Sequence, residues 1–331
     1  MELRDFDYHL PKELIAQYAV EPRDSCRLMV VDDKINHRHF RDILEYFSPG
    51  DVLVINETKV SRAKIVGNKT SGGAVEIMLC KRLDSQRFEC RIKHHVSLGA
   101  TCVFGKGLEC RIISKDEDIF VIEFNKEITP EIEKDFMLPL PPYVKEKIAD
   151  ENSYQTVYSS KEGSLAAPTA GLHFTPDLLS AIERKGVTIA KICLHVGFGT
   201  FLPIRTETVE DHRMHSEEYE VTPEVADAIN NRKGRLIVVG TTSVRTLESC
   251  AGSDGKVVPG KGATSIFIYP GYRFRNHIDG MITNFHLPKS TLLLLVSAYF
   301  GKEKIFDAYE EAVREKYRFY SLGDAMFLKK W

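Results

Sequence analysis

The stretch Ala166-Ala167-Pro168-Thr169-Ala170-Gly171-Leu172-His173-Phe174-Thr175-Pro176 indicates both a binding loop and the start of a helix. Pro168 fixes one backbone angle and Gly171 frees another, so a ligand can approach the backbone of this loop closely. Thr175 and Pro176 are typical of an N-cap and a first helical position, and we expect this helix to end at Gly186. The stretch therefore predicts a site-forming loop that leads directly into a helix.

Further strands and helices alternate on both sides of this loop. The apolar run 187–196 predicts a buried strand, which is followed by a second glycine-rich turn, Gly197-Phe198-Gly199-Thr200. The run 51–56 is a second buried-strand candidate and ends in polar residues, where open α/β sheets hold their ligands. Shorter strands are expected at 266–269 and 281–285, and helices at 290–300 and 302–317. These patterns predict an α/β core.

The hydrophobic pattern changes to period two between residues 60 and 125. Phe88, Cys90 and Ile92 alternate with charged residues, as in a strand with one buried and one wet face. Gly105-Lys106-Gly107 joins two such runs like a hairpin turn. We therefore predict a larger α/β domain formed by residues 1–58 and 154–331, with an antiparallel β-barrel domain inserted at 59–153.

The charge of the insert suggests a surface for nucleic acid. Residues 59–106 contain ten Lys/Arg and three Asp/Glu, although the whole chain has a net charge of −2. Arg87, Arg91 and Lys93 would share the wet face of one strand and contact phosphates, and Arg318 lies in a second basic and aromatic segment. The alternatives are a solvated sheet surface for the insert and a capping helix for the second segment.

Composition excludes several classes of protein. The 331 residues are 43% hydrophobic and 28% charged, which is typical of globular proteins. The most apolar stretch, 292–300, is about half the length of a membrane span, and the first five residues lack the order of a signal peptide. The seven cysteines include no Cys-x-x-Cys pair. We expect a cytoplasmic protein with no membrane association and no metal.

Several polar clusters are candidates for chemistry. His212, His215 and Glu217 could form a metal triad, but their spacing differs from that of the common zinc motif and a polar network fits equally. Residues 240–249 place hydroxyl groups and backbone N–H groups at a helix start, which suits an anion or a ribose. Arg245 and Glu248 are three apart, so they either pair with each other or bind substrate.

Several long blocks together resemble one family. They are 166–174, 211–220, 240–249, 269–272 and 283–294, flanked by shorter matches near both ends of the chain. The chain resembles, over essentially its whole length, the S-adenosylmethionine:tRNA ribosyltransferase-isomerase family of queuosine biosynthesis. The resemblance implies an α/β domain with an inserted β-barrel. It also implies transfer and isomerisation of the ribosyl group of S-adenosylmethionine onto 7-aminomethyl-7-deazaguanine at the tRNA wobble position, giving epoxyqueuosine, adenine and methionine.

The chemistry of that reaction suggests roles for particular residues. A general base must take a proton, and the sulfonium needs a carboxylate or an aromatic face nearby. With the resemblance, we expect His173 or His215 to move protons and Glu217 or Glu248 to stabilise the cation. Substrate would be held by Thr169, Gly171, Gly199, Thr242 and Arg245.

The same resemblance sets the expected partners and the rival classes. The partners are tRNA and S-adenosylmethionine, which would be a consumed donor, so no cofactor and no obligate protein partner are expected. A non-catalytic tRNA-binding module and a metal-dependent hydrolase are the rival classes. The first explains the basic insert but not the polar, glycine-rich turns; the second would use His212, His215 and Glu217.

Overall fold

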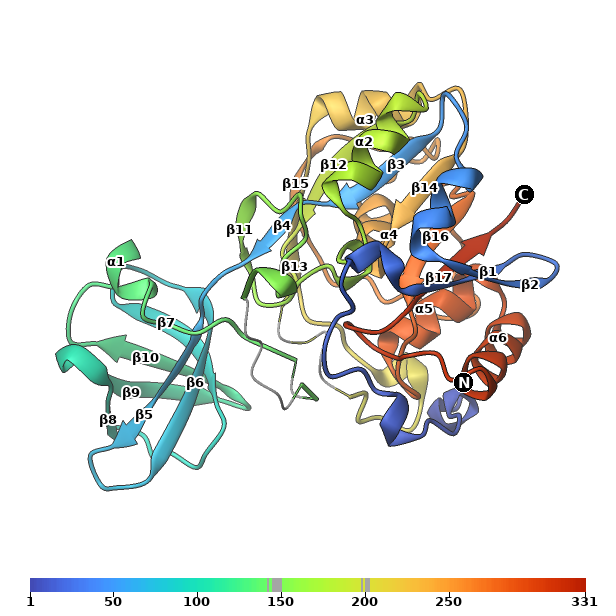
Figure 1. Cartoon of the computed structure of the whole chain (residues 1–331). Helices are drawn as coiled ribbons and strands as arrows, with labels where there is room; N and C mark the ends of the chain where they lie inside the picture. Colours follow the sequence, from blue (N-terminus) through green and yellow to red (C-terminus); the bar gives the residue numbers. More distant parts are fainter. Residues whose placement is uncertain (142, 145–150, 198, 200–202) are drawn as a thin grey trace. The chain divides into compact units, whose positions relative to one another are not determined.

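The computed structural model describes residues 1–141, 143–144, 151–197, 199 and 203–331, and it forms two compact units (Figure 1). The larger unit comprises 1–59 and 141–331, and the smaller comprises 60–140. The insert thus ends at Leu140, whereas we placed its end at residue 153. Arg23 explains the difference, because its guanidinium donates to the carbonyl groups of Asn152 and Gln155 and so ties this segment to the larger unit.

A nine-stranded sheet forms the centre of the larger unit. In order, its strands are β15 (Gly260–Thr264), β13 (Glu217–Val221), β12 (Thr188–Leu194), β3 (Val52–Asn56), β14 (Leu236–Val239), β16 (Gly280–Asn284), β17 (Ala325–Lys329), β1 (Arg27–Val31) and β2 (Ile35–His39). The four adjacent strands β12, β3, β14 and β16 run parallel, so their carboxyl ends lie at one edge. A separate two-stranded sheet pairs β11 (Lys161–Ser164) with β4 (Thr58–Val60).

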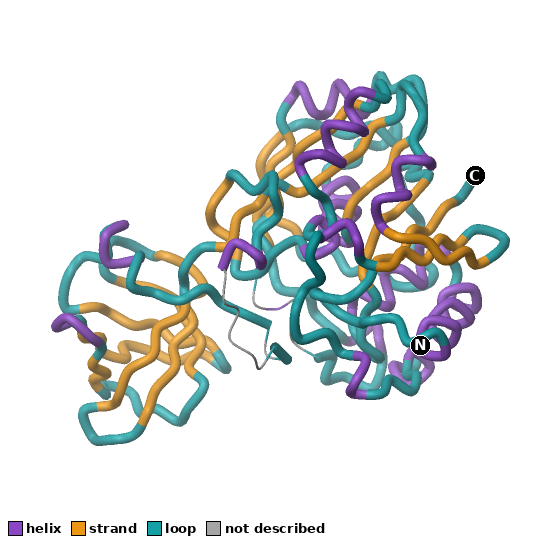
Figure 2. The backbone as a smooth tube through the Cα atoms, viewed as in Figure 1, coloured by secondary structure: helices purple, strands orange, loops and turns teal. Residues whose placement is uncertain are grey.

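Helices cover both faces of this sheet, as the tube in Figure 2 shows. Val52 and Val54 of β3 pack in the hydrophobic core on the side of α3 (Pro223–Asn230), α4 (Thr241–Ser249), α5 (Thr291–Phe300) and α6 (Lys302–Arg314). Leu53 and Ile55 face the opposite core, with α2 (Pro176–Arg184) and the 3₁₀ segment η4 (Phe40–Tyr46). Because every residue of β3 is buried, its sequence is apolar without alternation. The predicted α/β class is confirmed.

The predicted helix start is also confirmed. Thr175 is the N-cap of α2 and its hydroxyl accepts from the backbone N–H of Leu178 at 3.1 Å, with Pro176 in the first turn. Gly186 follows the helix with a φ of +86°, a conformation that favours glycine. The remaining 3₁₀ segments are η1 (Leu3–Phe6), η2 (Lys12–Leu14), η3 (Arg23–Ser25), η5 (Gly105–Gly107), η6 (Glu151–Tyr154), η7 (Thr169–Gly171) and η9 (Val209–Asp211).

The smaller unit is a closed, six-stranded antiparallel barrel. Its strands are β10 (Ile119–Phe124), β7 (Arg87–Ile92), β6 (Ala74–Arg82), β5 (Lys64–Lys69), β8 (Thr101–Val103) and β9 (Glu109–Asp116), in that order around the barrel, and the short helix α1 (Pro130–Glu133) follows them. Phe88 and Cys90 are buried while Arg87 is exposed, so the period-two pattern did identify a strand with one buried face. The inserted antiparallel barrel is therefore confirmed.

The local structure differs from the sequence analysis at one expected strand and adds features that were not predicted. Residues 266–269 form no strand, and the edge strand β15 lies just before them. We missed β17, an apolar run in the interior of the sheet that pairs with both β16 and β1. Residues 212–216, which carry His212 and His215, are not helical and lead directly into β13. Among the described residues, no helix combines the length and the apolar character that a membrane span requires.

Candidate functional site

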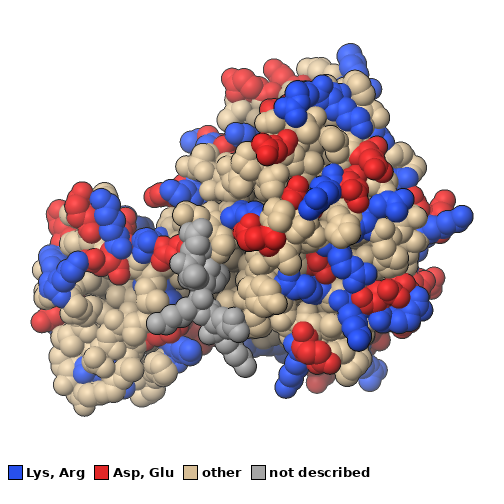
Figure 3. Space-filling view, viewed as in Figure 1, with Lys and Arg blue, Asp and Glu red and all other residues tan. Residues whose placement is uncertain are grey.

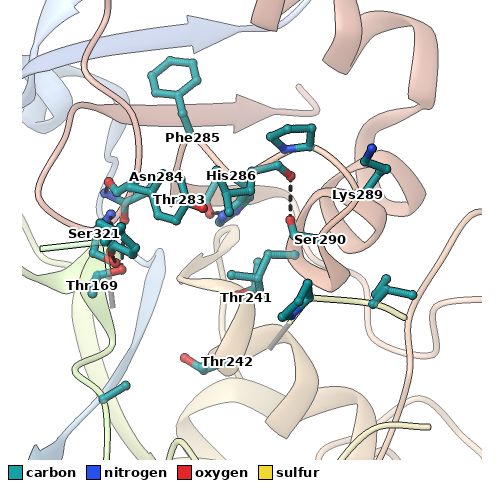
Figure 4. A pocket seen from close by; sticks show the side chains of 18 of the residues that line it. Thr169, Thr241, Thr242, Thr283, Asn284, Phe285, His286, Lys289, Ser290 and Ser321 are labelled. Carbon is teal, nitrogen blue, oxygen red and sulfur yellow. Dashed lines mark hydrogen bonds between the residues drawn. The ribbon is translucent and has the colours of Figure 1, made fainter. Parts of the chain in front are cut away.

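A cavity of about 970 Å³ lies where the parallel strands of the large sheet end. Its walls include Val196 after β12, residues 240–242 after β14, and residues 283–286 at the end of β16 (Figure 4). The loop 166–170 forms another wall, as its small and constrained residues predicted. This volume is at the upper end of the range for small-molecule sites, and its position is where open α/β sheets bind ligands.

The cavity wall is mostly apolar, and hydroxyl and amide groups stand at a few places in it. Thr169, Thr241, Thr242, Thr283, Asn284, Ser290 and Ser321 all contribute to its wall. The buried Asn56 at the end of β3 stands behind Thr242, with its amide nitrogen 3.0 Å from the carbonyl oxygen of Leu194 and 3.5 Å from the Thr242 hydroxyl. These uncharged groups suit a ligand with several hydroxyl and amino groups, such as a nucleoside.

Aromatic and charged groups occupy other parts of the wall. The rings of Tyr143 and Tyr320 lie with their centroids 4.1 Å apart, and both residues line the cavity. Charged residues also contribute: Glu2, Arg4, Arg205, Glu207 and Lys289. Lys289 is paired with Asp7 at 2.8 Å. The cavity thus offers π faces and both signs of charge to a ligand.

His286 is a cavity residue that the sequence analysis missed. It is buried, lines the cavity, and has its Nε2 2.9 Å from the Thr283 hydroxyl. Burial lowers the pKa of His286 to about 3, so its imidazole is neutral at pH 7. His286 could have been identified from the sequence because it follows the buried strand β16, and polar residues after such strands reach ligand sites.

His173, in contrast, lies outside the cavity wall. It is 4% exposed, with Nδ1 3.2 Å from Cys26 Sγ and Nε2 3.1 Å from the amide nitrogen of Asn284. Burial lowers the pKa of His173 to about 4. His173 therefore reaches the cavity through Asn284, not directly.

The structure brings Glu217 and Arg245 together as a buried ion pair between β13 and α4. Glu217 also accepts from the backbone N–H of Gly197 at 2.8 Å, and Arg245 Nε donates to the carbonyl of Ile266 at 3.3 Å. Neither side chain contributes to the cavity wall, but Gly197 follows the wall residue Val196. The pair thus fixes the strand end that borders the cavity.

Gly199 and His215 lie against each other beside this pair. A Cβ at Gly199 would meet His215 Cδ2 at 2.4 Å, so the glycine is required by close packing. His215 itself is exposed. Phe198 and Thr200 of the same turn lie outside the described residues.

Glu248 occupies a different place from the other predicted residues. Its carboxylate accepts hydrogen bonds from the Tyr272 hydroxyl, the backbone N–H groups of Arg275 and Asn276, and the Asn276 side chain. It is 1% exposed and does not line the cavity. This geometry suits a residue that holds the 272–276 segment, and α4 therefore does not pair Glu248 with Arg245.

Of the predicted substrate residues, Thr169 and Thr242 line the cavity, and Gly171 lies immediately behind its wall. A Cβ at Gly171 would be 1.9 Å from the Tyr158 hydroxyl oxygen and 3.0 Å from Thr156 Cγ2. Gly171 is therefore needed for packing of the loop. It does not line the cavity, so its role does not require direct contact with substrate.

Gly171→Ala is expected to reduce the free energy of unfolding by about 1–3 kcal/mol, because the added methyl group overpacks a buried site. Tyr158→Phe should recover part of this loss, since it removes the nearest atom and that hydroxyl has no hydrogen-bond partner among the described residues. Denaturant unfolding of both single variants and the double variant measures the coupling. Strict additivity of the two changes would contradict the proposed clash.

The proposed metal triad is not assembled in the described part of the chain. No group of three or more His, Cys, Asp or Glu side chains there has an arrangement that could hold a metal ion. His212 instead packs edge-on against Phe267, with ring centroids 5.2 Å apart, and Glu217 is committed to Arg245. The geometry gives the metal-dependent hydrolase no support.

The predicted RNA-contacting residues fall into two separate units. Arg87 and Arg91 project from the outer face of β7 in ion pairs with Asp84 and Asp118, and Lys93 is exposed just beyond this strand. Arg318 belongs to the larger unit, where its guanidinium stacks 4.9 Å above the Tyr18 ring. Only Lys93 among the four is an exposed cation for which the structure gives no ion pair.

The barrel is also less basic than its first half. Residues 60–140 contain thirteen Lys/Arg and twelve Asp/Glu, because 107–140 is acidic. Charges of both signs lie side by side on the smaller unit in Figure 3, in keeping with ion pairs such as Lys64–Glu76 and Lys106–Asp135. Positive charge remains concentrated on β5, β6 and β7, which are adjacent in the barrel.

Together, the parallel strand ends and the cavity define an α/β protein with a large small-molecule site, which carries an inserted barrel. Known proteins share this organisation over the full chain. The model of the family described as queuosine biosynthesis protein matches residues 3–328. The chain therefore belongs to this family, as its motif blocks indicated, and it is an enzyme of queuosine biosynthesis.

Individual relatives agree with the family match. The S-adenosylmethionine:tRNA ribosyltransferase-isomerase of Pelotomaculum thermopropionicum is 52% identical, covering 99% of this chain and all of its own. The protein of the same name from Symbiobacterium thermophilum is 53% identical with the same coverage. The crystal structure of S-adenosylmethionine tRNA ribosyltransferase from Thermotoga maritima is 35% identical, covers 98% of this chain and 99% of its own, and has a TM-score of 0.57.

Proposed function

We propose that this enzyme transfers the ribosyl group of S-adenosylmethionine onto 7-aminomethyl-7-deazaguanine at the tRNA wobble position and isomerises it to epoxyqueuosine. Adenine and methionine are released, so S-adenosylmethionine is a consumed substrate. The observation that carries the proposal is the 970 Å³ cavity, a mostly apolar site with a few hydroxyl and amide groups, in a chain of this family. We place the reaction in the cytoplasm.

The cavity wall supplies groups for the donor. Thr169 and Thr242, which both line the cavity, are assigned to ribose hydroxyls, and the N-terminus of α4 at Thr241 adds favourable backbone N–H groups for an anionic group. Tyr143 and Tyr320, whose tilted rings contact each other, both line the cavity, and we assign the sulfonium to an aromatic face there because a cation is attracted to a π face. The carboxylates of Glu217 and Glu248 are already bound to protein groups, so we assign both residues to holding the segments around the site in place.

Proton transfer is assigned to residues that can reach a ligand. His286 lines the cavity as a neutral imidazole, so we assign to it the proton that the acceptor amine loses when it bonds to the ribosyl carbon. The carbon beside the sulfonium is too weakly acidic for an imidazole with a pKa of about 3. His215, which the motif blocks suggested, remains a second candidate, although it is exposed beside Gly199 and does not line the cavity. His286→Gln is expected to reduce turnover by about 10²–10⁴-fold if this base is used.

The reaction is tested by incubating the protein with S-adenosylmethionine and tRNA that carries 7-aminomethyl-7-deazaguanine. Mass spectrometry should detect free adenine and epoxyqueuosine together. A folded protein that binds tRNA but releases no adenine would support the rival reading as a non-catalytic binding module. Retention of full activity in a chelator would count against the metal-dependent hydrolase.

The basic strands of the barrel are assigned to tRNA phosphates. Lys81 and Lys93 are exposed on the β5–β7 side, and replacing both by Glu should weaken tRNA binding and reduce its dependence on salt. Lys134→Glu is the matched control, since Lys134 is an exposed lysine in the acidic part of the same unit. Titrations between about 50 and 200 mM salt should show a steep decrease in tRNA affinity and little change for S-adenosylmethionine. Equal salt slopes for both ligands would remove the proposed role of this surface.

A further inference from the structure

The carboxamide of Asn284 has one orientation that satisfies its neighbours. Its amide nitrogen lies 3.1 Å from the carbonyl oxygen of Tyr320 and 3.1 Å from Nε2 of His173. A carbonyl oxygen only accepts, so the group beside Tyr320 must be the NH₂ of the amide. Asn284 Oδ1 then lies on the side of Thr169, 3.5 Å from its hydroxyl, and both residues line the cavity.

This orientation determines where His173 carries its proton. The second N–H of the Asn284 amide donates to Nε2, so Nε2 must be unprotonated. A neutral imidazole has one N–H, which is then on Nδ1 and donates to Cys26 Sγ at 3.2 Å. Cys26, His173 and Asn284 are all buried, so water cannot replace any of these partners at low cost.

We propose that His173 is a positioning residue whose Nδ1–H tautomer, held by Cys26, orients Asn284 so that its Oδ1 accepts a hydrogen bond from a hydroxyl or amino group of S-adenosylmethionine. The inference rests on the proposed function, because its ligand is the donor of that reaction. The 3.5 Å separation from Thr169 is at the limit of a hydrogen bond, so Oδ1 retains capacity for a ligand. His173 does not touch the cavity and is not itself a catalytic residue.

The other tautomer of His173 would exchange the acceptor that Asn284 places at the cavity for a donor. With its proton on Nε2, His173 would place one donor against another, the NH₂ of Asn284. Rotation of the amide would relieve that conflict but would set Oδ1 against the Tyr320 carbonyl and turn the NH₂ toward Thr169. Cys26 therefore determines, through the tautomer of His173, whether Asn284 places its oxygen or its nitrogen toward the ligand.

Two pairs of variants of the full chain test this coupling. Cys26→Ser keeps an acceptor for Nδ1–H, whereas Cys26→Val removes it with little change in volume. His173→Gln can place an acceptor near the position of Nε2, whereas the shorter His173→Asn cannot. We expect Cys26→Val and His173→Asn to raise the Kd for S-adenosylmethionine about tenfold, and their partners to stay within about threefold of the parent protein.

Three further readouts separate positioning from a general structural role. Nitrogen-15 NMR of histidine-labelled protein should show the Nδ1–H tautomer in the parent and a change in Cys26→Val. Thermal unfolding is measured for each variant. The Kd values of each pair are then compared at a temperature at which both members are folded. The pH profile of kcat for His173→Gln should retain the limbs of the parent profile, which it would lose if His173 transferred a proton.

An Nε2–H tautomer in the parent protein would overturn the proposal. So would equal donor Kd values within both pairs, or loss of a pH limb in His173→Gln. Failure of the parent protein to bind S-adenosylmethionine or to release adenine would instead refute the proposed function. The two failures are therefore distinguishable.

Discussion

Lowering the pH from 7 to 5 is expected to remove about 2 kcal/mol of folding stability for each of the two buried histidines, His173 and His286. Burial lowers their pKa values to about 4 and about 3, from the 6.5 of an exposed imidazole. Between these values and pH 6.5 the unfolded chain binds protons that the folded protein does not bind. The stability contributed by a neutral buried histidine is therefore present above pH 6.5 and decreases as the pH falls below it.

Denaturant unfolding at a series of pH values measures this effect. His173→Gln and His286→Gln should each flatten the dependence of stability on pH between 7 and 5, even where they lower stability overall. His9→Gln is the matched control, because His9 is exposed in the same unit and its replacement should leave the slope unchanged. If both Gln variants retained the parent slope, the two imidazoles would not be held neutral by burial.

The parts of the fold that followed from the sequence are those with local signals. Thr175, Pro176 and Gly186 mark the ends of α2 through capping chemistry that acts within a few residues. Phe88 and Cys90 reveal β7 because one face of a barrel strand is buried and the other is wet. In contrast, β17 is buried between β16 and β1, so its short apolar run carries neither alternation nor a cap and is ambiguous on its own.

In the candidate site, too, residues with local sequence signals were predicted, whereas contacts between residues distant in sequence were not. Thr169 lies in the loop whose composition indicated close approach, Thr242 lies in the helix start that was proposed to hold a ligand, and both reach the cavity. Glu248 and His173 have the side chains that the chemistry needs but are used by partners distant in sequence, such as Asn276 and Cys26. No spacing in the sequence reveals these partners, and none reveals that Glu217 meets Arg245 across 28 positions.

Arg245→Met is expected to reduce the free energy of unfolding by about 3–5 kcal/mol, because it leaves the carboxylate of Glu217 buried without its cation. Glu217 and Arg245 are 5% and 4% exposed, so water cannot compensate for the loss. The double variant Glu217→Met with Arg245→Met should recover most of this stability, since two apolar side chains replace a desolvated ion pair. Denaturant unfolding of the three proteins measures the recovery.

The activity of the same double variant tests whether the ion pair also shapes the cavity wall, in addition to stabilising the fold. Methionine at 217 cannot accept the hydrogen bond from Gly197, so the strand end beside Val196 loses a restraint on the cavity wall. We expect the double variant to be folded and to have a higher KM for S-adenosylmethionine, with a smaller change in kcat. Lys304→Met with Asp33→Met, an exposed pair 3.6 Å apart in the same unit, should change neither property. A folded double variant with the KM of the parent would show that the ion pair contributes to stability alone, because the turn at Gly197 would then hold its shape without the Glu217 carboxylate.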